Sequence, residues 1–484
     1  MRILLSVACV GSLVVACGDD DDGGAGAADA AVHADGAPGA ADGAVADGAP
    51  EPPDAMPPPD ATPLPEITSR QVVTGFGFTC LLAPTGEVKC WGENGQGQLG
   101  QGDNVHRGDM PGEISALRPI AIDPVPMVKR LAAGQNHVCA LLNDGRVKCW
   151  GGNTHGQLGL GDTAARGDGP GEMGAALPAV DLGTGHTAQR IAVGGDTTCA
   201  LLDDFSVKCW GDNSEGQLGL GDTAARGDGP GEMGDALPAL ALGDVRTVDL
   251  GLGTYFACAL DESGEVRCWG GNSEGELGQG NTQYRGDGPG EMGSALLPVR
   301  LPTGLHVLTL AVGKFHTCVL LDDASTRCWG AGGSGQLGAG NTLNRGDVAG
   351  QMGNDLHAVD LGGSTAFDVV MTQSDSCALI SDGSLKCWGA NFFGQAGQGH
   401  TRHIGDEPGE MGSALGRIVV GAAGGIRRVA QIAGGGEHMC MLYEDGGLRC
   451  WGYNVAGQCG QGTTGAIGDE PGEMDALQDI PVAF

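Results

Sequence analysis

The chain has 484 residues, a formal net charge of −34, 92 glycines and 17 cysteines, while only 4% of its residues are aromatic. A charge this negative repels nucleic acid, so we expect no nucleic-acid partner. The glycine content indicates frequent tight turns rather than long helices.

The first 16 residues have the composition of an export signal. Arg2 is followed by an apolar run over 3–16, which is too short to span a bilayer comfortably as a permanent helix. The run ends in Val-Val-Ala-Cys at Cys17, a pattern that resembles the signal of bacterial lipoproteins. The resemblance implies removal of residues 1–16, lipidation of Cys17 and attachment to a bacterial cell envelope through the lipid alone. We expect the outer membrane, on its periplasmic side or at the cell surface.

Residues 17–66 are predicted to form a disordered tether. Positions 18–66 hold twelve acidic residues and no lysine or arginine, mixed with alanine, glycine and proline. Such a segment cannot bury enough apolar surface to offset its chain entropy. We therefore assign the folded domain to residues 67–484.

The folded part repeats one unit: a cysteine, nine residues, then Cys-Trp-Gly. All seven tryptophans of the chain follow these second cysteines, at intervals of 59 to 63 residues. This period indicates one supersecondary unit stacked on its neighbours. The seven cysteine pairs are Cys80 with Cys90, Cys139 with Cys149, Cys199 with Cys209, Cys258 with Cys268, Cys318 with Cys328, Cys377 with Cys387, and Cys440 with Cys450.

Each unit contains a recognisable hairpin. Over 138–150, two runs of β-forming residues flank Asn143-Asp144-Gly145, and Asp-Gly is a strong hairpin signal. Two apolar stretches upstream of each hairpin bring the count to about four short strands per unit. Seven such units predict an all-β, seven-bladed propeller with four-stranded blades. Residues 480–484 match the strand that opens the other units, so we expect them to pair with the first blade and close the ring.

The residues around each tryptophan resemble a known repeat family. The segments WGGNTHGQLG at 150–159 and WGDNSEGQLG at 210–219, with ALLNDGRVKCWG at 140–151, are similar to the pattern of the regulator of chromosome condensation repeat. The resemblance covers all seven units and implies a seven-bladed propeller. Because the surface is so acidic, we do not expect the chromatin-binding or small-GTPase exchange roles of nuclear members.

The cysteine spacing favours disulfides. In an exported protein the pairs can oxidise, and a turn midway between them places the two sulfurs on opposed residues. We predict seven disulfides, one per unit; reduced cysteines acting as small core residues are the alternative. The spacing is not that of zinc ligands, and no metal is assigned. Cys459 stands where most units have leucine and is predicted to be a small core residue.

Three recurring motifs could be mistaken for chemistry. Arg-Gly-Asp occurs once in each of five units, which indicates a structural loop rather than an adhesion signal. The acidic pair Asp168 and Glu172 could coordinate calcium, but a loop cap or an ion pair is the simpler account. His137, His316 and His438 precede three hairpins, while other units carry other residues there, so no ligand set converges.

Residues that differ between units are the better guide to function. The candidate binding residues are Phe392, Phe393, Tyr284, Tyr453, His400 and His403. Aromatic residues on loops are good interface anchors, although a core role is an alternative for each. We predict a monomeric protein- or glycan-binding or scaffolding module with no cofactor and no assigned catalytic residue. The alternative is an envelope lyase or hydrolase at the channel mouth, so the question of enzymatic activity stays open.

Overall fold

The computed structural model describes residues 70–123, 127–418 and 427–484. The predicted signal peptide 1–16, the lipidation site Cys17 and the tether 17–66 lie outside these ranges, as does Ile67, the predicted start of the folded domain. No helix of the described residues combines the length and the apolar character needed to cross a bilayer.

The described chain forms seven antiparallel sheets of three strands, each in chain order. The inner strands are β1 (Gln71–Thr74), β4 (Val128–Ala133), β7 (Ala188–Gly194), β10 (Thr247–Leu252), β13 (Val307–Val312), β16 (Ala366–Met371) and β19 (Val429–Gly434). The middle strands are β2 (Phe78–Leu82), β5 (His137–Leu142), β8 (Thr197–Leu202), β11 (Phe256–Asp261), β14 (His316–Leu321), β17 (Asp375–Ile380) and β20 (His438–Tyr443). The third strands are β3 (Val88–Gly92), β6 (Val147–Gly151), β9 (Val207–Gly211), β12 (Val266–Gly270), β15 (Thr326–Gly330), β18 (Leu385–Gly389) and β21 (Leu448–Gly452).

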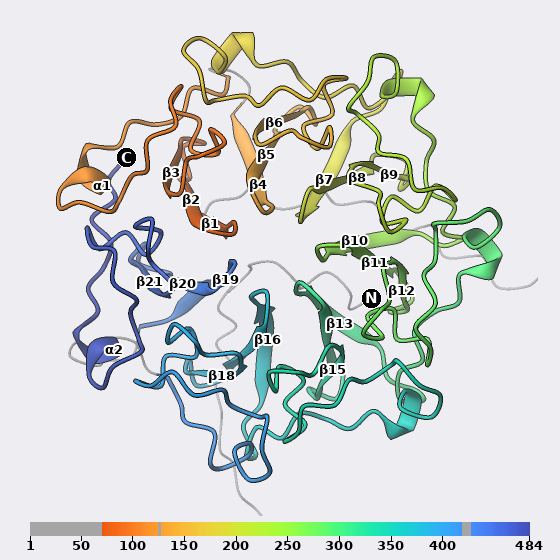
Figure 1. Cartoon of the computed structure of the whole chain (residues 1–484), viewed down its shortest axis with the longest axis vertical. Coiled ribbons are helices and arrows are strands. Elements are labelled where there is room, and N and C mark those ends of the chain that lie inside the picture. The colour runs from red at the N-terminus through yellow and green to blue at the C-terminus, as the bar shows by residue number, and fades with distance from the viewer. Residues whose placement is uncertain (1–69, 124–126, 419–426) are drawn as a thin grey trace, which may run out of the picture. The chain divides into compact units, whose positions relative to one another are not determined.

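The few helices are single turns at the periphery (Figure 1). They are α1 (Glu113–Ala116), α2 (Glu473–Ala476) and the 3-10 turns η1 (Gly174–Ala176), η2 (Gly234–Ala236), η3 (Gly293–Ala295) and η4 (Gly353–Asp355).

The sheets stand as blades around a central axis (Figure 1). Strand β1 contacts both β4 and β19, and the remaining inner strands contact their neighbours in turn, so the ring is closed. The expected seven-bladed, all-β propeller is confirmed.

Each blade has three strands where four were expected. The Leu-Pro segments do lie outside the third strand, but within the described residues each makes only an isolated contact with it. In blade two, the Val180 N–H donates to the Val147 carbonyl at 2.8 Å, and Leu240 bonds Val207 in the same way in blade three. Pro178, two residues before Val180, has no N–H to donate. Blade five makes the same single bond, from the Val359 N–H to the Thr326 carbonyl at 2.9 Å, with His357 in place of that proline, so the isolated contact does not depend on proline.

The core lies between the blades. Each tryptophan is fully buried, and its indole N–H donates to a main-chain carbonyl of the preceding blade at 2.8 to 3.1 Å. The bonds run from Trp91 to Gln458, Trp150 to Gln98, Trp210 to Gln157, Trp269 to Gln217, Trp329 to Glu276, Trp388 to Gln336 and Trp451 to Gln395. The interface between the last and first blades therefore repeats the other six.

The prediction that residues 480–484 pair with the first blade was wrong. The Ile480 N–H donates to the Leu448 carbonyl of β21, in the last blade, at 2.8 Å, and these residues form no strand. Side chains supply the contact with the first blade: Lys89 Nζ donates to the Ala483 carbonyl and lies 5.4 Å from the centre of the Phe484 ring. The reason is that the Leu-Pro-x-Val segment ends a blade and does not open the next one.

The seven predicted disulfides are confirmed, one in each blade. Each joins directly opposed residues of the middle and third strands, with Cα atoms 4.0 to 4.2 Å apart. The alternative, reduced cysteines packed as small core residues, does not hold for these pairs. The bridges join Cys80 to Cys90, Cys139 to Cys149, Cys199 to Cys209, Cys258 to Cys268, Cys318 to Cys328, Cys377 to Cys387, and Cys440 to Cys450.

Among the described cysteines, Cys459 alone has no disulfide. It is fully buried, and burial raises the pKa of its thiol. Cys459 packs as a small core residue, as the leucine of the other repeats does.

Candidate functional site

The residues predicted to bind a partner lie on loops at one end of the ring. The turns between inner and middle strands lie at this end. The loops that follow each Trp-Gly pair lie there too, because Phe78 at the start of β2 pairs with Gly92 at the end of β3. We call this end the mouth face.

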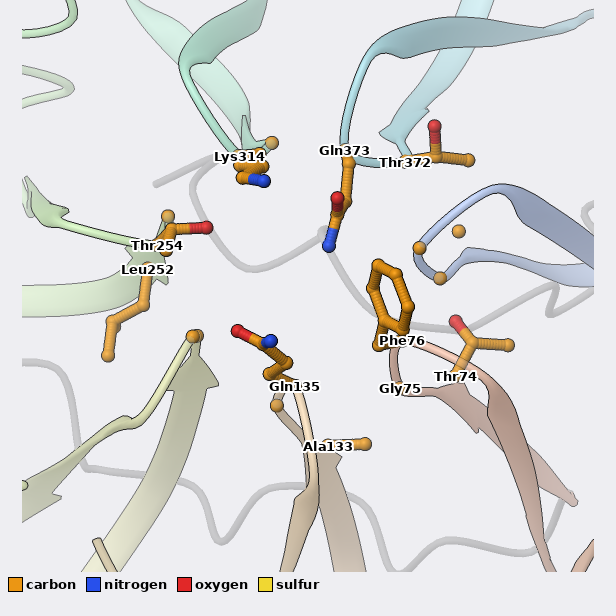
Figure 2. A pocket seen from close by; sticks show the side chains of 18 of the residues that line it. Thr74, Gly75, Phe76, Ala133, Gln135, Leu252, Thr254, Lys314, Thr372 and Gln373 are labelled. Atoms are coloured by element: carbon orange, nitrogen blue, oxygen red, sulfur yellow. The ribbon is translucent and has the colours of Figure 1, made fainter. Parts of the chain in front are cut away.

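At the centre of the mouth face, the seven turns surround a cavity of about 130 Å³ (Figure 2). Phe76, Gln135 and Gln373 extend toward its middle, and Lys314 also lines it (Figure 2). Lys314 is the one titratable side chain in the lining that the structure describes. A lyase or hydrolase at the mouth would need carboxylate, tyrosine or histidine groups, and the described lining supplies none of these.

The Arg-Gly-Asp segments are built into the loops of the mouth face. Arg166 pairs with Asp162 at 2.7 Å, and its main chain forms a bridge with Gly151 at the end of β6. The Asn153 side-chain amide donates to the Asp162 carbonyl at 2.7 Å, which fixes the same loop. The arginine is therefore held by its own blade, as expected of a structural turn.

The pair Asp168 and Glu172 belongs to the same loop. Glu172 Oε2 accepts the N–H groups of Gly167 and Gly169, both at 2.9 Å, and therefore caps the turn. Burial and the neighbouring Glu172 raise the pKa of Asp168. Within the described residues Glu172 therefore acts as a loop cap, which is the simpler of the two interpretations of this pair.

The three candidate histidines lie at separate blade interfaces and are fully buried. Nε2 of each is 2.9 or 3.0 Å from a hydroxyl of the next blade: His137 from Thr198, His316 from Ser376, and His438 from Thr79. Burial lowers the pKa of each ring to about 3. They act as neutral hydrogen-bonding groups between blades.

Several of the residues predicted to bind a partner come together on blades six and seven. The Phe392 and His403 rings meet edge-on with centroids 4.4 Å apart, and Phe393 lies 4.7 Å from Tyr453. Phe392 keeps 59% of its surface exposed. We call Phe392, Phe393, His403 and Tyr453 the aromatic patch.

His400 belongs to the loop beneath this patch. Its Nδ1 accepts the Arg402 N–H at 3.2 Å and lies 3.3 Å from the Asn391 side-chain nitrogen. Burial and the nearby Arg402 lower its pKa. His400 therefore shapes the loop that carries the patch.

Tyr284 lies apart from the patch, in the fourth blade, among carboxylates. Burial, followed by the charges of Glu215 and Glu276, raises its pKa. Glu276 is itself only 3% exposed, and burial, together with the charges of nearby glutamates, raises its pKa to about 7. We call this region of the mouth face the acidic sector; it comprises Asp196, Asp212, Glu215, Glu274 and Glu276.

Some carboxylates of the mouth face have a structural partner in the preceding blade. The Gln157 side-chain amide donates to Asp196 at 2.9 Å, and Gln395 donates to Glu437. Burial raises the pKa of Glu437 to about 7, against the opposing effects of Gln395 and Lys314. Lys314 and Glu437 carry no motif or repeat signal that would mark them in the sequence.

The opposite end of the ring carries a group of potential metal ligands. Among the residues that the structure describes, His186, Asp203 and Asp204 are the one such group of three. His186 Nδ1 lies 3.3 Å from Asp203 and 3.8 Å from Asp204. At the corresponding hairpin of the last blade Arg427 takes the place of the histidine and pairs with Asp445.

Comparison with known proteins agrees with this architecture. The model of the RCC1-like domain family matches residues 7–347, and that of the regulator of chromosome condensation (RCC1) repeat matches residues 429–461. The E3 ubiquitin-protein ligase HERC2 of Mus musculus is 27% identical over 415 residues, which are 83% of this chain and 7% of HERC2. The ultraviolet-B receptor UVR8 of Arabidopsis thaliana is 28% identical over 277 residues, 57% of this chain and 56% of UVR8. The chain thus spans less than two thirds of each of these relatives.

Solved structures show the same fold. Prp20p from Saccharomyces cerevisiae has a TM-score of 0.58 at 18% identity, covering 84% of this chain and 86% of Prp20p. Human WBSCR16 has a TM-score of 0.57 at 18% identity, covering 81% of this chain and 92% of WBSCR16. Since the family model matches well over half of the sequence, this chain belongs to the RCC1-like domain family.

Proposed function

We propose that this propeller is a protein-binding module that engages its partner through the mouth face while lipid on Cys17 holds it at a bacterial cell envelope. The observation that carries the proposal is the aromatic patch. Phe392 and His403 pair within blade six, and Phe393 pairs with Tyr453 of blade seven. Blades two and three have Thr154-His155 and Ser214-Glu215 where blade six has Phe392-Phe393.

The patch has the properties of an interface anchor. The contact between Phe393 and Tyr453 joins the loops of blades six and seven, so both rings are held before a partner arrives. Large apolar rings fixed in this way add contact area at little cost in side-chain entropy. Val455, 54% exposed on the corresponding loop of blade seven, adds an aliphatic neighbour.

The acidic sector supports a partner with basic residues. It lies on the mouth face over blades three and four, in a chain with a net charge of −34. Complementary charge accelerates encounter and fixes the orientation of a complex more than it adds affinity. We therefore propose a partner surface that presents an apolar cluster beside lysine or arginine side chains.

The envelope location, with the outer membrane as the expected site, rests on the sequence of residues 1–17 and is supported by chemistry. Seven disulfides are stable in an oxidising compartment and rare in a reducing one. Metabolic labelling of the wild type and of Cys17→Ser with an alkyne-tagged fatty acid tests the anchor. Label on the wild type alone supports lipidation of Cys17, and label on neither protein contradicts it.

Binding is tested by chemical cross-linking and capture from envelope extracts, using the non-lipidated Cys17→Ser chain as bait. The test variant is Phe392→Ser/Phe393→Ser. Its matched control is Phe367→Ser, since Phe367 is 64% exposed but lies at the end of β16 away from the mouth. A saturable partner retained by the control and lost in the test variant supports the proposal, whereas equal capture by both variants refutes it. Protease treatment of the captured material separates a protein partner from a glycan.

A further inference from the structure

One position on the inner strands carries a polar side chain in every blade. It pairs with the leucine two residues after the first cysteine of each hairpin, and in every blade it is half-buried. The residues are Gln71, Arg130, Arg190, Asp249, Thr309, Asp368 and Gln431. We call them the inner-strand ring, because each stands on the strand of its blade that lies nearest the central axis (Figure 1).

Two members of the ring show what this position does when it serves the fold. The Gln431 side chain accepts the Val72 N–H and donates to the Val72 carbonyl, both at 2.9 Å. Gln71 binds Leu131 of the next blade in the same way, at 2.9 and 3.1 Å. Each glutamine thus joins its own blade to the main chain of the following one.

Arg130 and Arg190 occupy the same position in blades two and three, but they do not repeat this contact. A guanidinium has only donors, so it cannot accept the N–H of the next strand. Arg190 Nη1 instead bonds Asp249 of blade four at 3.1 Å. Among the described residues no hydrogen-bond partner faces the Arg130 side chain, and its Nε is buried without one.

Asp249 interacts with both guanidinium groups: it accepts a hydrogen bond from Arg190, and its charge acts on Arg130 without a hydrogen bond. Burial and the charge of Arg190 lower the pKa of Arg130, which means that its positive charge is unfavourable where it stands. An unpartnered buried donor and a neighbouring like charge both destabilise a fold. In a chain with 60 acidic and 26 basic residues, these two arginines stand on neighbouring inner strands without the main-chain contact that Gln71 and Gln431 make.

We propose that Arg130 and Arg190 bind a compact oxyanion, a carboxylate or a phosphate, at the inner strands β4 and β7. The planar guanidinium presents paired N–H donors that match such an anion, and Asp249 fixes the orientation of Arg190. A single negative charge would balance the excess positive charge of the group. Ala133 lines the mouth cavity, and Arg130 lies three residues further along β4, about 10 Å deeper. This site is separate from the aromatic patch and does not depend on the proposed partner.

The test is the melting temperature of the non-lipidated Cys17→Ser chain in sodium phosphate, sodium acetate or sodium chloride at equal ionic strength. We expect a saturable rise with phosphate or acetate beyond the chloride value, and the responding anion identifies the ligand class. In Arg130→Gln the rise should disappear. Lys129→Gln removes the same charge from the same strand and should keep the rise.

Arg130→Gln has a second readout that does not depend on the anion. Its glutamine can bond Ile191 as Gln71 bonds Leu131, so without phosphate or acetate the variant should melt at a higher temperature than the parent chain. An unchanged or lower melting temperature for this variant without anion contradicts our account of Arg130.

Calorimetric titration of phosphate or acetate into the parent chain and Arg190→Gln provides an independent check. We expect at least tenfold weaker binding by the variant. The proposal is overturned if neither anion binds saturably, or if Arg130→Gln or Arg190→Gln binds as tightly as the parent.

Discussion

Ile120 and Ile480 form a matched pair that tests how the ring is closed. Each donates its N–H to the third strand of its own blade at 2.8 Å, to Val88 and Leu448 respectively. They are 7% and 5% exposed. Ile120 packs in a cluster between blades one and two, and Ile480 in the corresponding cluster between blade seven and blade one. The two differ in that only Ile480 lies at the point where the chain closes.

Replacement by alanine removes three side-chain carbons from each cluster. At about 0.8 kcal/mol for each buried carbon, the loss of transfer free energy is about 2.4 kcal/mol. The cavity that remains raises the cost, and measured values for such core substitutions are about 2–5 kcal/mol. We expect Ile120→Ala and Ile480→Ala each to lower the free energy of unfolding by about 3 kcal/mol, because the seven interfaces are equivalent.

The assay is urea unfolding under oxidising conditions, followed by the fluorescence of the interface tryptophans. The losses of unfolding free energy in the two variants should agree to within about 1 kcal/mol, which is the variation expected between similar buried sites. A negligible cost for Ile480→Ala would show that the last interface is open in solution. A much larger cost for Ile480→Ala than for Ile120→Ala would show that the C-terminal segment stabilises the closed ring beyond the packing that every interface between blades provides.

Three further predictions concern stability. Replacing Cys199 and Cys209 by alanine should lower the free energy of urea unfolding by about 2–3 kcal/mol, and a smaller loss than about 1 kcal/mol would contradict the role of the bridge. Glu276→Gln should raise stability at pH 8 by up to about 3 kcal/mol and leave it unchanged at pH 4. The folded-state pKa of Glu276 is about 7, above its ordinary value of 4.5, so stability is lost as pH rises between them; an equal gain at both pH values would refute this. His438→Gln should flatten the acid side of the stability profile, because the folded-state pKa of about 3 makes the wild type lose stability as pH falls from 6.5 towards 3; an unchanged acid side in a melting series would count against it.

The architecture could be predicted because its signals are local and repeated. The interval between tryptophans fixed the number of blades, and the Asp-Gly turn between Cys139 and Cys149 placed the two cysteines on opposed strands. One wrong prediction also recurs from blade to blade. The composition of the segment around Val180 predicts a strand, yet this segment makes a single main-chain hydrogen bond to β6.

Ring closure could not be predicted from the sequence in the same way. The segment around Ile480 is compatible with pairing either to its own blade or to the next one, and hydrophobic pattern does not distinguish the two. What decides is the packing of Trp91 against Gln458, a contact between residues 367 positions apart. Such a contact follows from the geometry of the whole ring.

Residues of the candidate site could be predicted only where they differ in type from the residues at the same position of the other repeats. Phe392 and Phe393 break the pattern of their repeat, and the structure brings them to His403 and Tyr453. Lys314 was missed, although the residues just after each inner strand vary between repeats whose flanks are constant. Periodicity alone does not show that these variable positions meet at one cavity.

The most direct test of the proposed function is site-specific photo-cross-linking in intact cells. Benzoyl-phenylalanine replaces either Phe392, in the aromatic patch, or Phe367, which is similarly exposed at the other end of blade six. Our account predicts a discrete adduct from position 392 that is lost when Tyr453→Ser is added, and no adduct from position 367. Equal labelling from both positions, or none from position 392, would contradict the assignment of the mouth face as the binding surface.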